Sequence, residues 1–270
     1  MPKEETMRFI MIFLWMILLS AVMPLSADQW KVDIGAGVWN NTVSGAIKST
    51  LNQTIYFKDN LTTNENQQDG YFYVSLSHPL PLLPNARLEY VNLNTTNRDI
   101  ELGAHTTYLP SGISTTSSSV QSSLEMRQYD AILFYNVIDQ PAGVTLDLGL
   151  DLKYLLTDYH IDSVFSSSDS TIVPLIYAKG RVDIPVMDIG IEADGKFITD
   201  GSSTVYDLRF KVDYTMTFIP IVHPGLELGY RVEQFTSKGE ESALIGPILS
   251  GKTDSDIGFS GFYGGVKVCF

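Results

Sequence analysis

The chain has 270 residues, a single cysteine and a formal net charge of −13 at pH 7. This negative charge excludes nucleic acid as a partner, because phosphate binding needs a basic face, and the single cysteine excludes an intramolecular disulfide. Beyond one apolar run near the N-terminus, no segment is long and apolar enough to predict a membrane helix.

Residues 1–27 have the three parts of a secretory signal peptide. Lys3 and Arg8 give a basic start, residues 9–22 are almost continuously apolar, and small residues lead to an expected cleavage after Ala27. The alternative is a membrane anchor, but the run is shorter than the roughly 20 residues that a spanning helix needs. Met7 is an alternative start to Met1 and leaves this interpretation unchanged.

From residue 28 onward, apolar and polar residues alternate with a period of two, which indicates strands and no amphipathic helix. The clearest run extends from Val144 to Tyr154, where leucines alternate with threonine, aspartate, glycine and lysine. The alternation predicts strands at residues 29–39, 70–78, 86–94, 123–137, 143–157, 172–184, 189–198, 204–218, 225–236 and 257–270.

These predicted strands are mostly longer than the five or six residues of typical soluble strands. A soluble sandwich also alternates, but long strands behind a signal peptide favour an all-β, transmembrane antiparallel up-and-down β-barrel. Ten strands place both termini on the same side, as single-chain bacterial barrels require. We therefore expect residues 28–270 to form one outer-membrane barrel.

The predicted connections are mostly long on one side and short on the other. The four short connections on one side contain proline, which ends a strand because it cannot donate to a ladder. Barrels of this class have tight periplasmic turns and longer outer loops. Long polar loops, which also hold most of the surplus negative charge, including Asp69, are expected near residues 40–69, 95–122, 158–171 and 237–256.

Aromatic residues near the predicted strand ends suggest two belts at the membrane interfaces, where amphipathic rings are favoured. The strand from residue 123 is harder to interpret, because Glu125 and Arg127 share the parity of its apolar face, which indicates a bulge or a rim above the lipid. The expected belts contain Trp30, Tyr135, Phe218 and Phe270 on the periplasmic side, and Trp39, Tyr154, Tyr206 and Phe235 on the outer side.

The final predicted strand carries Val266, Val268 and Phe270 on one face, an apolar pattern that ends on an aromatic residue. Other short motifs are Gly35-x-Gly37-x-Trp39, the turn from His78-Pro79 to Pro84-Asn85, and Leu88-x-Tyr90. With the signal peptide, these motifs resemble a family of functionally uncharacterised outer-membrane β-barrel proteins of Gram-negative bacteria. The resemblance implies residence in the cell outer membrane and recognition of the final strand by the barrel-assembly machinery. It implies no catalytic residues.

The polar faces of the predicted strands, taken as the barrel interior, carry about a dozen acids and about ten bases. Opposite charges in a narrow bore are expected to pair, since an unpaired buried charge costs several kcal/mol. A selective pore normally shows one sign of charge, so we expect a salt-bridged lumen that is largely closed to solutes. The expected network contains Asp147, Asp151, Lys153, Lys179, Arg181, Asp183, Asp207, Arg209, Lys211, Asp213 and Arg231; the same faces carry Asp33, Glu89, Asp130, Glu192, Asp194, Lys196, Glu227 and Glu233.

Two alternatives to a structural or interaction role stay open: a narrow solute channel and a surface hydrolase. Asp158-Tyr159-His160 resembles one half of the catalytic set of omptin proteases, in which a carboxylate orients a histidine as a base. The other half, an Asp-x-Asp pair on an earlier strand, is missing, and no His-x-Ser pair of the lipid A deacylase type exists. We therefore expect no enzymatic activity and no catalytic residue.

We expect no cofactor and no metal. Asp254-Ser255-Asp256 has too few oxygen ligands for a calcium site, and Cys269 is interpreted as a buried lumen or rim thiol. The expected surroundings are outer-membrane lipid and lipopolysaccharide, and the barrel is expected to be a monomer.

Overall fold

The computed structural model describes residues 30–48, 54–56, 67–80, 82–101, 105–109, 112–116, 119–140, 143–161, 165–184, 186–217, 221–237 and 254–270. The expected signal peptide and Phe218 lie outside these ranges. In the part of the chain that the structure describes, no helix has the length and apolar character needed to cross a membrane.

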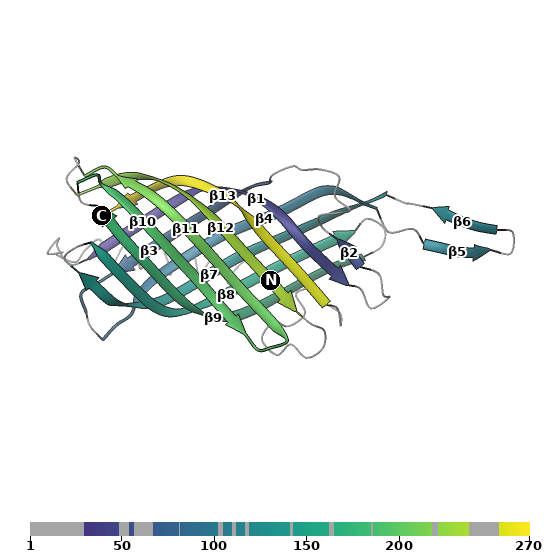
Figure 1. Ribbon diagram of the computed structural model, residues 1–270, viewed down its shortest axis with the longest axis horizontal. Coiled ribbons are helices and arrows are strands. Elements are labelled where there is room, and N and C mark those ends of the chain that lie inside the picture. Colours follow the sequence, from purple (N-terminus) through teal and green to yellow (C-terminus); the bar gives the residue numbers. More distant parts are fainter. Residues whose placement is uncertain are drawn as a thin grey trace, which may run out of the picture.

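The regular elements of the described residues are strands. Three of them are short. The strand β2 (Thr54–Tyr56) pairs with β1. The strands β5 (His105–Leu109) and β6 (Gly112–Thr116) form a separate hairpin beyond one end of the long strands (Figure 1). The long strands are β1 (Lys31–Lys48), β3 (Gln67–Ser77), β4 (Asn85–Glu101), β7 (Ser119–Gln140), β8 (Val144–Ile161), β9 (Phe165–Ile184), β10 (Ile189–Thr199), β11 (Ser203–Thr215), β12 (His223–Ser237) and β13 (Asp254–Cys269).

The long strands form a closed antiparallel barrel. They pair in the order β13-β12-β11-β10-β9-β8-β7-β4-β3-β1, and β13 also pairs with β1 (Figure 1). The seam extends from Asp33↔Cys269 to Lys48↔Asp254, and Val32 and Phe270 exchange backbone hydrogen bonds of 3.3 and 2.9 Å. Closure removes the free sheet edges that hydrocarbon cannot satisfy. The prediction of a closed ten-stranded antiparallel barrel is confirmed.

Apolar side chains cover the outside of this barrel, and charged side chains lie inside it. On β8, Leu150 is 65% exposed while its neighbours Asp151 and Lys153 are buried. On β11, Leu208 and Phe210 are likewise exposed. An exterior of this kind is stable only in hydrocarbon, because water would meet a continuous apolar surface. The strands therefore span a membrane.

Three tyrosines form a row on the outer surface of the barrel, near one end of the band of exposed apolar side chains. Tyr90 and Tyr129 lie 5.0 Å apart by their ring centroids, and Tyr129 and Tyr154 lie 6.3 Å apart. Beyond this row, Arg127 on β7 pairs with Asp158 on β8 at 2.9 Å, while the β7–β8 register is regular at Arg127. Of the two interpretations of Arg127, the rim above the lipid is therefore the one observed.

Two residues of the expected outer belt lie in the lumen instead. Trp39 is 1% exposed and Phe235 is 0% exposed, and both belong to a cluster of buried apolar residues. Trp39 shares the parity of Gly35 and Gly37, which face inward, so its position near a strand end does not place it against lipid. Its assignment to the belt was wrong for this reason. Tyr135, Tyr154 and Phe270 are exposed as expected.

The strands also extend further than the alternation predicts. β1 continues to Lys48 and β3 begins at Gln67, so part of the expected loop 40–69 is barrel wall. β4, β7, β8 and β9 likewise extend into the expected loops 95–122 and 158–171. Beyond the membrane both faces of a strand can be polar, so alternation disappears although the ladder continues.

The turn between β3 and β4 shows how the proline-containing connections are fixed. The His78 backbone N–H donates to Asn85 Oδ1 at 2.9 Å, and the Leu80 N–H donates to His78 Nδ1 at 3.2 Å. Asn85 in turn donates to Asn136 on β7 at 2.8 Å. His78 is therefore a turn residue, as its place before Pro79 suggests.

Candidate functional site

The centre of the lumen contains two lysines whose side chains are 0% exposed, Lys153 on β8 and Lys196 on β10. Both point inward because they share the parity of their strands' buried faces. The Lys153 ammonium lies 2.7 Å from Glu233, 3.2 Å from Asp130 and 3.4 Å from Asp207. A single cation thus joins β8 to β12, β7 and β11.

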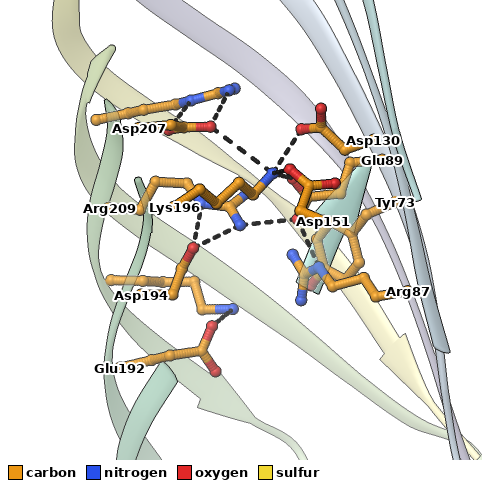
Figure 2. A network of polar contacts seen from close by, with 12 residues as sticks. Tyr73, Arg87, Glu89, Asp130, Asp151, Glu192, Asp194, Lys196, Asp207 and Arg209 are labelled. Carbon is orange, nitrogen blue, oxygen red and sulfur yellow. Dashed lines mark hydrogen bonds and ion pairs between the residues drawn. The ribbon is translucent and has the colours of Figure 1, made fainter. Parts of the chain in front are cut away.

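Lys196 makes a corresponding set of contacts from β10, which is separated from β8 by β9 alone (Figure 2). Its ammonium lies 2.5 Å from Asp130 and 2.7 Å from Glu89, with Asp151 and Asp207 each at 3.7 Å. Asp130 therefore bridges the two lysines. The pairing extends across the bore, because β10 is not a neighbour of β4 or β7 in the barrel.

Three arginines enclose this centre. Arg231 donates two hydrogen bonds to Asp207, at 2.9 and 2.7 Å. Arg209 lies 2.7 Å from both Glu89 and Asp194, and Arg87 lies 2.5 Å from Glu89. Gln128, whose side chain is neutral, donates a further hydrogen bond to the Glu233 carboxylate at 2.8 Å. Bonds to charged groups of this kind are about twice as strong as neutral ones.

A second group of ion pairs lies nearer the short turns. Its contacts are Arg181–Asp213 at 2.6 Å, Arg181–Asp183 at 2.7 Å, Lys179–Asp147 at 2.7 Å, Lys211–Glu192 at 3.0 Å and a contact between Lys267 and Asp213. The side chain of Asp183 is 47% exposed and marks the edge of the network. Each of the eleven residues of the expected network takes part in at least one ion pair.

Two luminal tyrosines donate hydrogen bonds to a carboxylate of the same network. The Tyr71 hydroxyl donates to Glu227 at 2.6 Å and the Tyr73 hydroxyl donates to the other carboxylate oxygen at 2.9 Å. A Cβ on Gly35 would clash with the ring of Tyr73, and a Cβ on Gly37 would clash with the backbone of Gly264 and with the Tyr71 hydroxyl. The Gly35-x-Gly37 motif thus lets these rings lie against the β1 wall and reach β12.

The alternation does not reveal the apolar layer of the lumen on the side of the long connections. There the inward faces carry apolar residues, and Arg231 lies over the Trp39 ring at 4.6 Å. The outward neighbours of these residues are apolar on β8 but polar on β1, where they are Asn40 and Thr42. The available signal is weak: a strand end with apolar residues at both parities, such as Leu155 between Tyr154 and Leu156. The layer contains Trp39, Val43, Val91, Leu93, Met126, Leu155, Val173, Leu175, Val205, Phe235, Ile257, Phe259 and Tyr263.

The proposed hydrolase pair lies partly outside the described side chains. His160 belongs to β8, and its backbone pairs with Ser123 and Ser166, but its side chain is not among those described. Hydrogen bonds from Ser168 and Arg127 hold the pKa of Asp158 below its usual value. The pairing of Asp158 with His160 stays a prediction.

Among the described residues, no group of histidine, cysteine, aspartate and glutamate has the arrangement of a metal site. Asp256 accepts a hydrogen bond from Thr236 at 3.1 Å, whereas the side chains of Asp254 and Ser255 lie outside the description. Cys269 is a half-buried free thiol.

No family model matches the chain, and no curated protein matches it in sequence. Among solved structures, the outer membrane protease OmpT from Escherichia coli is similar, with 11% identity and a TM-score of 0.48, over 92% of this chain and 99% of that one. Ail, the attachment invasion locus protein of Yersinia pestis, has 11% identity and a TM-score of 0.31, over 88% and 99% of the two chains. The P. putida toluene transporter TodX has 6% identity and a TM-score of 0.31, over 90% of each chain.

These similarities are too distant to carry an argument about activity. The fold assignment depends on the strand pairing and on the apolar exterior of this chain itself.

Proposed function

We propose that this chain is an outer-membrane barrel with a closed lumen, and that its role is structural or interactive. The apolar exterior, the closed strand ladder and the expected signal peptide support the outer membrane as its location. In this role the long polar connections make the contacts of the protein with its surroundings, and the lumen is not a transport path. We expect no enzymatic activity.

The observation that carries the proposal is the pairing of Lys196 with Glu89 and Asp130 across the bore. A solute crossing the lumen would have to separate these charges, and an uncompensated buried charge costs several kcal/mol. The apolar layer beneath the long connections adds a second barrier, because polar solutes and ions are excluded from apolar constrictions. Balanced charges also leave no net attraction for one sign of ion.

The expected partners are outer-membrane lipid and lipopolysaccharide around the barrel, and the assembly machinery that would read the final strand. Val266 and Phe270 support the last expectation, since both are exposed on the outside of the barrel beside the seam, while Val268 is half-buried. The protein is expected to function as a monomer, since closure leaves no barrel strand in need of a second copy.

Single-channel recording in planar bilayers tests the closed lumen. We expect silence or rare brief openings at neutral pH from the purified barrel. Steady openings would overturn the proposal and support a narrow solute channel instead.

A charge-neutral double variant supplies the control. Glu89→Ala with Lys196→Ala removes one acid and one base, so the net charge of the lumen is preserved while the connection across the bore is lost. We expect it to open more often than the unaltered barrel, which would show that the recording detects openings when the network is weakened. Equal silence of the folded variant would contradict the role given to this connection.

A further inference from the structure

Three turns at one end of the barrel expose apolar side chains. They lie at the end marked C in Figure 1, where β1 begins and β13 ends, because strand pairing places all three there. Leu82 in the β3–β4 turn is 89% exposed, Val186 in the β9–β10 turn is 95% exposed, and Ile221 in the β11–β12 turn is 80% exposed. With their exposed neighbours, these residues define the apolar turns: Leu80, Leu82 and Leu83, Val186 and Met187, and Ile221.

The apolar outer face of the barrel continues into these turns. On β9 the outward parity passes from Val182 through Ile184 to Val186, and on β10 it passes from Met187 to Ile191. Both runs are apolar throughout. Where the hydrocarbon ends, the outward face of a strand normally changes to interfacial aromatic and then polar residues. No such change occurs on β9 or β10 before the turn that joins them.

At the opposite end of the barrel the outward face does become polar. Beyond the tyrosine row, the outward positions of β7 and β8 carry the ion pair between Arg127 and Asp158. The short turn between β10 and β11 at that end contains Asp200, Gly201 and Ser202. Short length is therefore not the reason that the apolar turns lack polar side chains.

A hydrogen bond fixes the β3–β4 turn against the lipid-facing surface. Tyr135 is an exposed side chain on the outer face of β7, and its hydroxyl donates to the carbonyl of Leu82 at 3.3 Å. Within the turn, the Leu83 N–H donates to the Leu80 carbonyl at 3.4 Å. The exposed leucines are thus held on the outer side of the wall, next to the residues that contact lipid.

Polar groups in the apolar turns have partners within the protein. The Nδ1 atom of His78 accepts from the Leu80 N–H, and its Nε2 atom lies 3.1 Å from the carbonyl of Pro84. The Asp188 carboxylate accepts from the Thr217 hydroxyl at 3.1 Å, and its carbonyl accepts from the Thr215 N–H at 2.9 Å. Internal pairing of this kind is what polar groups need at the edge of hydrocarbon, where water is scarce.

We propose that the apolar turns insert into the lipid of the adjacent leaflet, so that this end of the barrel lies within the membrane rather than in water. The outward apolar surface is continuous from the strands to the turns. Lipid, which covers the strands, therefore covers the turns as well. In the outer membrane, the location proposed above, this leaflet is the periplasmic one, but insertion itself does not depend on which membrane contains the barrel.

A protein partner in the aqueous compartment is the other occupant that an exposed apolar surface could have. Such a partner would be expected to bind a patch with a polar border, as interfaces have a polar rim. The apolar turns have no polar border toward the lipid-facing strands, since Val182 and Ile191 lead directly to Val186 and Met187. Lipid is therefore the occupant that the surface favours.

Fluorescent labels at single cysteines test the insertion. Cys269→Ser removes the native thiol, and Leu82→Cys or Val186→Cys then places one nitrobenzoxadiazole label in an apolar turn. Leu150→Cys on the lipid-facing wall is the control for lipid, and Ser202→Cys in the opposite turn is the control for water. The four labelled barrels are refolded in phosphatidylcholine vesicles, and the shift in gel mobility between unheated and heated samples shows that each is folded.

Two quenchers distinguish lipid from water around each label. One is a nitroxide attached near the carbonyl end of a phospholipid acyl chain, and the other is iodide on both sides of the membrane. We expect the nitroxide lipid to quench the labels at residues 82 and 186, as it does the label at residue 150. We expect iodide to quench both labels less than it quenches the label at residue 202, and their emission to lie at shorter wavelength.

Two outcomes would overturn the proposal. One is iodide quenching at residue 82 or 186 that equals the quenching at residue 202, and the other is a lack of nitroxide quenching at either turn. Both would leave the apolar turns in water, as a surface for a protein partner. The vesicles contain no other protein, so lipid contact measured there is a property of the barrel alone, and it is independent of the conductance of the lumen.

Discussion

Asp207 and Asp151 are both buried carboxylates of the lumen, but their surroundings differ. Asp207 accepts two hydrogen bonds from Arg231 and lies 3.4 Å from Lys153. Both oxygens of Asp151 lack a hydrogen-bond partner among the described residues, and its ion pair with Lys196 is long, at 3.7 Å. The stability that a buried charge gives depends on these bonds rather than on burial itself, because burial alone disfavours the charge.

We therefore expect Asp207→Asn to lower the free energy of unfolding by about 3 kcal/mol, since it removes the carboxylate that accepts two hydrogen bonds from Arg231 and pairs with Lys153. Asp151→Asn, equally buried and equally isosteric, is expected to change it by less than about 1 kcal/mol, because no hydrogen bond is lost. Denaturant unfolding of the two variants in lipid vesicles measures the difference. Equal losses would contradict this account of the network.

At the scale of the element, glycine leaves space on the strand β1 for the tyrosine rings of β3. Gly35 faces the lumen, and a Cβ there would meet the ring of Tyr73, whose hydroxyl is bonded to Glu227. A methyl group at this position therefore moves the ring and lengthens its hydrogen bond. Gly180, which has the lipid-facing parity of β9, has no such role, because a Cβ there would meet no atom within 4 Å.

We expect Gly35→Ala to destabilise the barrel by about 2 kcal/mol, the typical cost of overpacking a close contact. Gly180→Ala is the control, since a Cβ on Gly180 meets no atom within 4 Å, and its effect should stay within about 0.5 kcal/mol. Thermal unfolding in detergent, followed by circular dichroism, compares the two. A larger loss in Gly180→Ala would contradict the assignment.

The strands could be predicted because lipid outside and charge inside impose alternation, as in β8. The apolar layer could not, because at Leu155 both faces of the strand are apolar and alternation carries no information. Trp39 was misplaced for a related reason: its aromatic character indicates a membrane interface, while only its parity with Gly37 indicates the lumen. The ladder between β3 and β4, which extends only from Tyr71↔Val91 to Leu76↔Ala86, depends on which backbones pair, and side-chain patterns do not record that.

At the scale of the whole molecule, a few backbone bonds complete the seam at one of its ends. Val32 and Phe270 exchange two of them, and Val268 pairs with Ile34 on one side and with Pro224 on the other. Without these residues, the strand β1 keeps an unpaired segment that hydrocarbon cannot satisfy.

We expect deletion of residues 268–270 to reduce strongly the fraction of barrel that refolds into lipid vesicles, as measured by the shift in gel mobility between unheated and heated samples. Phe270→Leu keeps the backbone bonds and an apolar side chain, so it should refold in vesicles like the unaltered chain. Normal refolding of the deletion variant would show that the seam closes without these bonds. Loss of refolding in Phe270→Leu would indicate a requirement for the aromatic ring itself.

The seam also has a consequence for export to the outer membrane, the location that we propose. The strands that it joins, β1 and β13, are separated in the chain by the 205 residues from 49 to 253, so β1 leaves the translocation channel long before its partner. During that interval its hydrogen-bonding edge is free in an aqueous compartment, where such edges promote aggregation. We therefore expect a periplasmic chaperone that shields nascent strands to act on this chain.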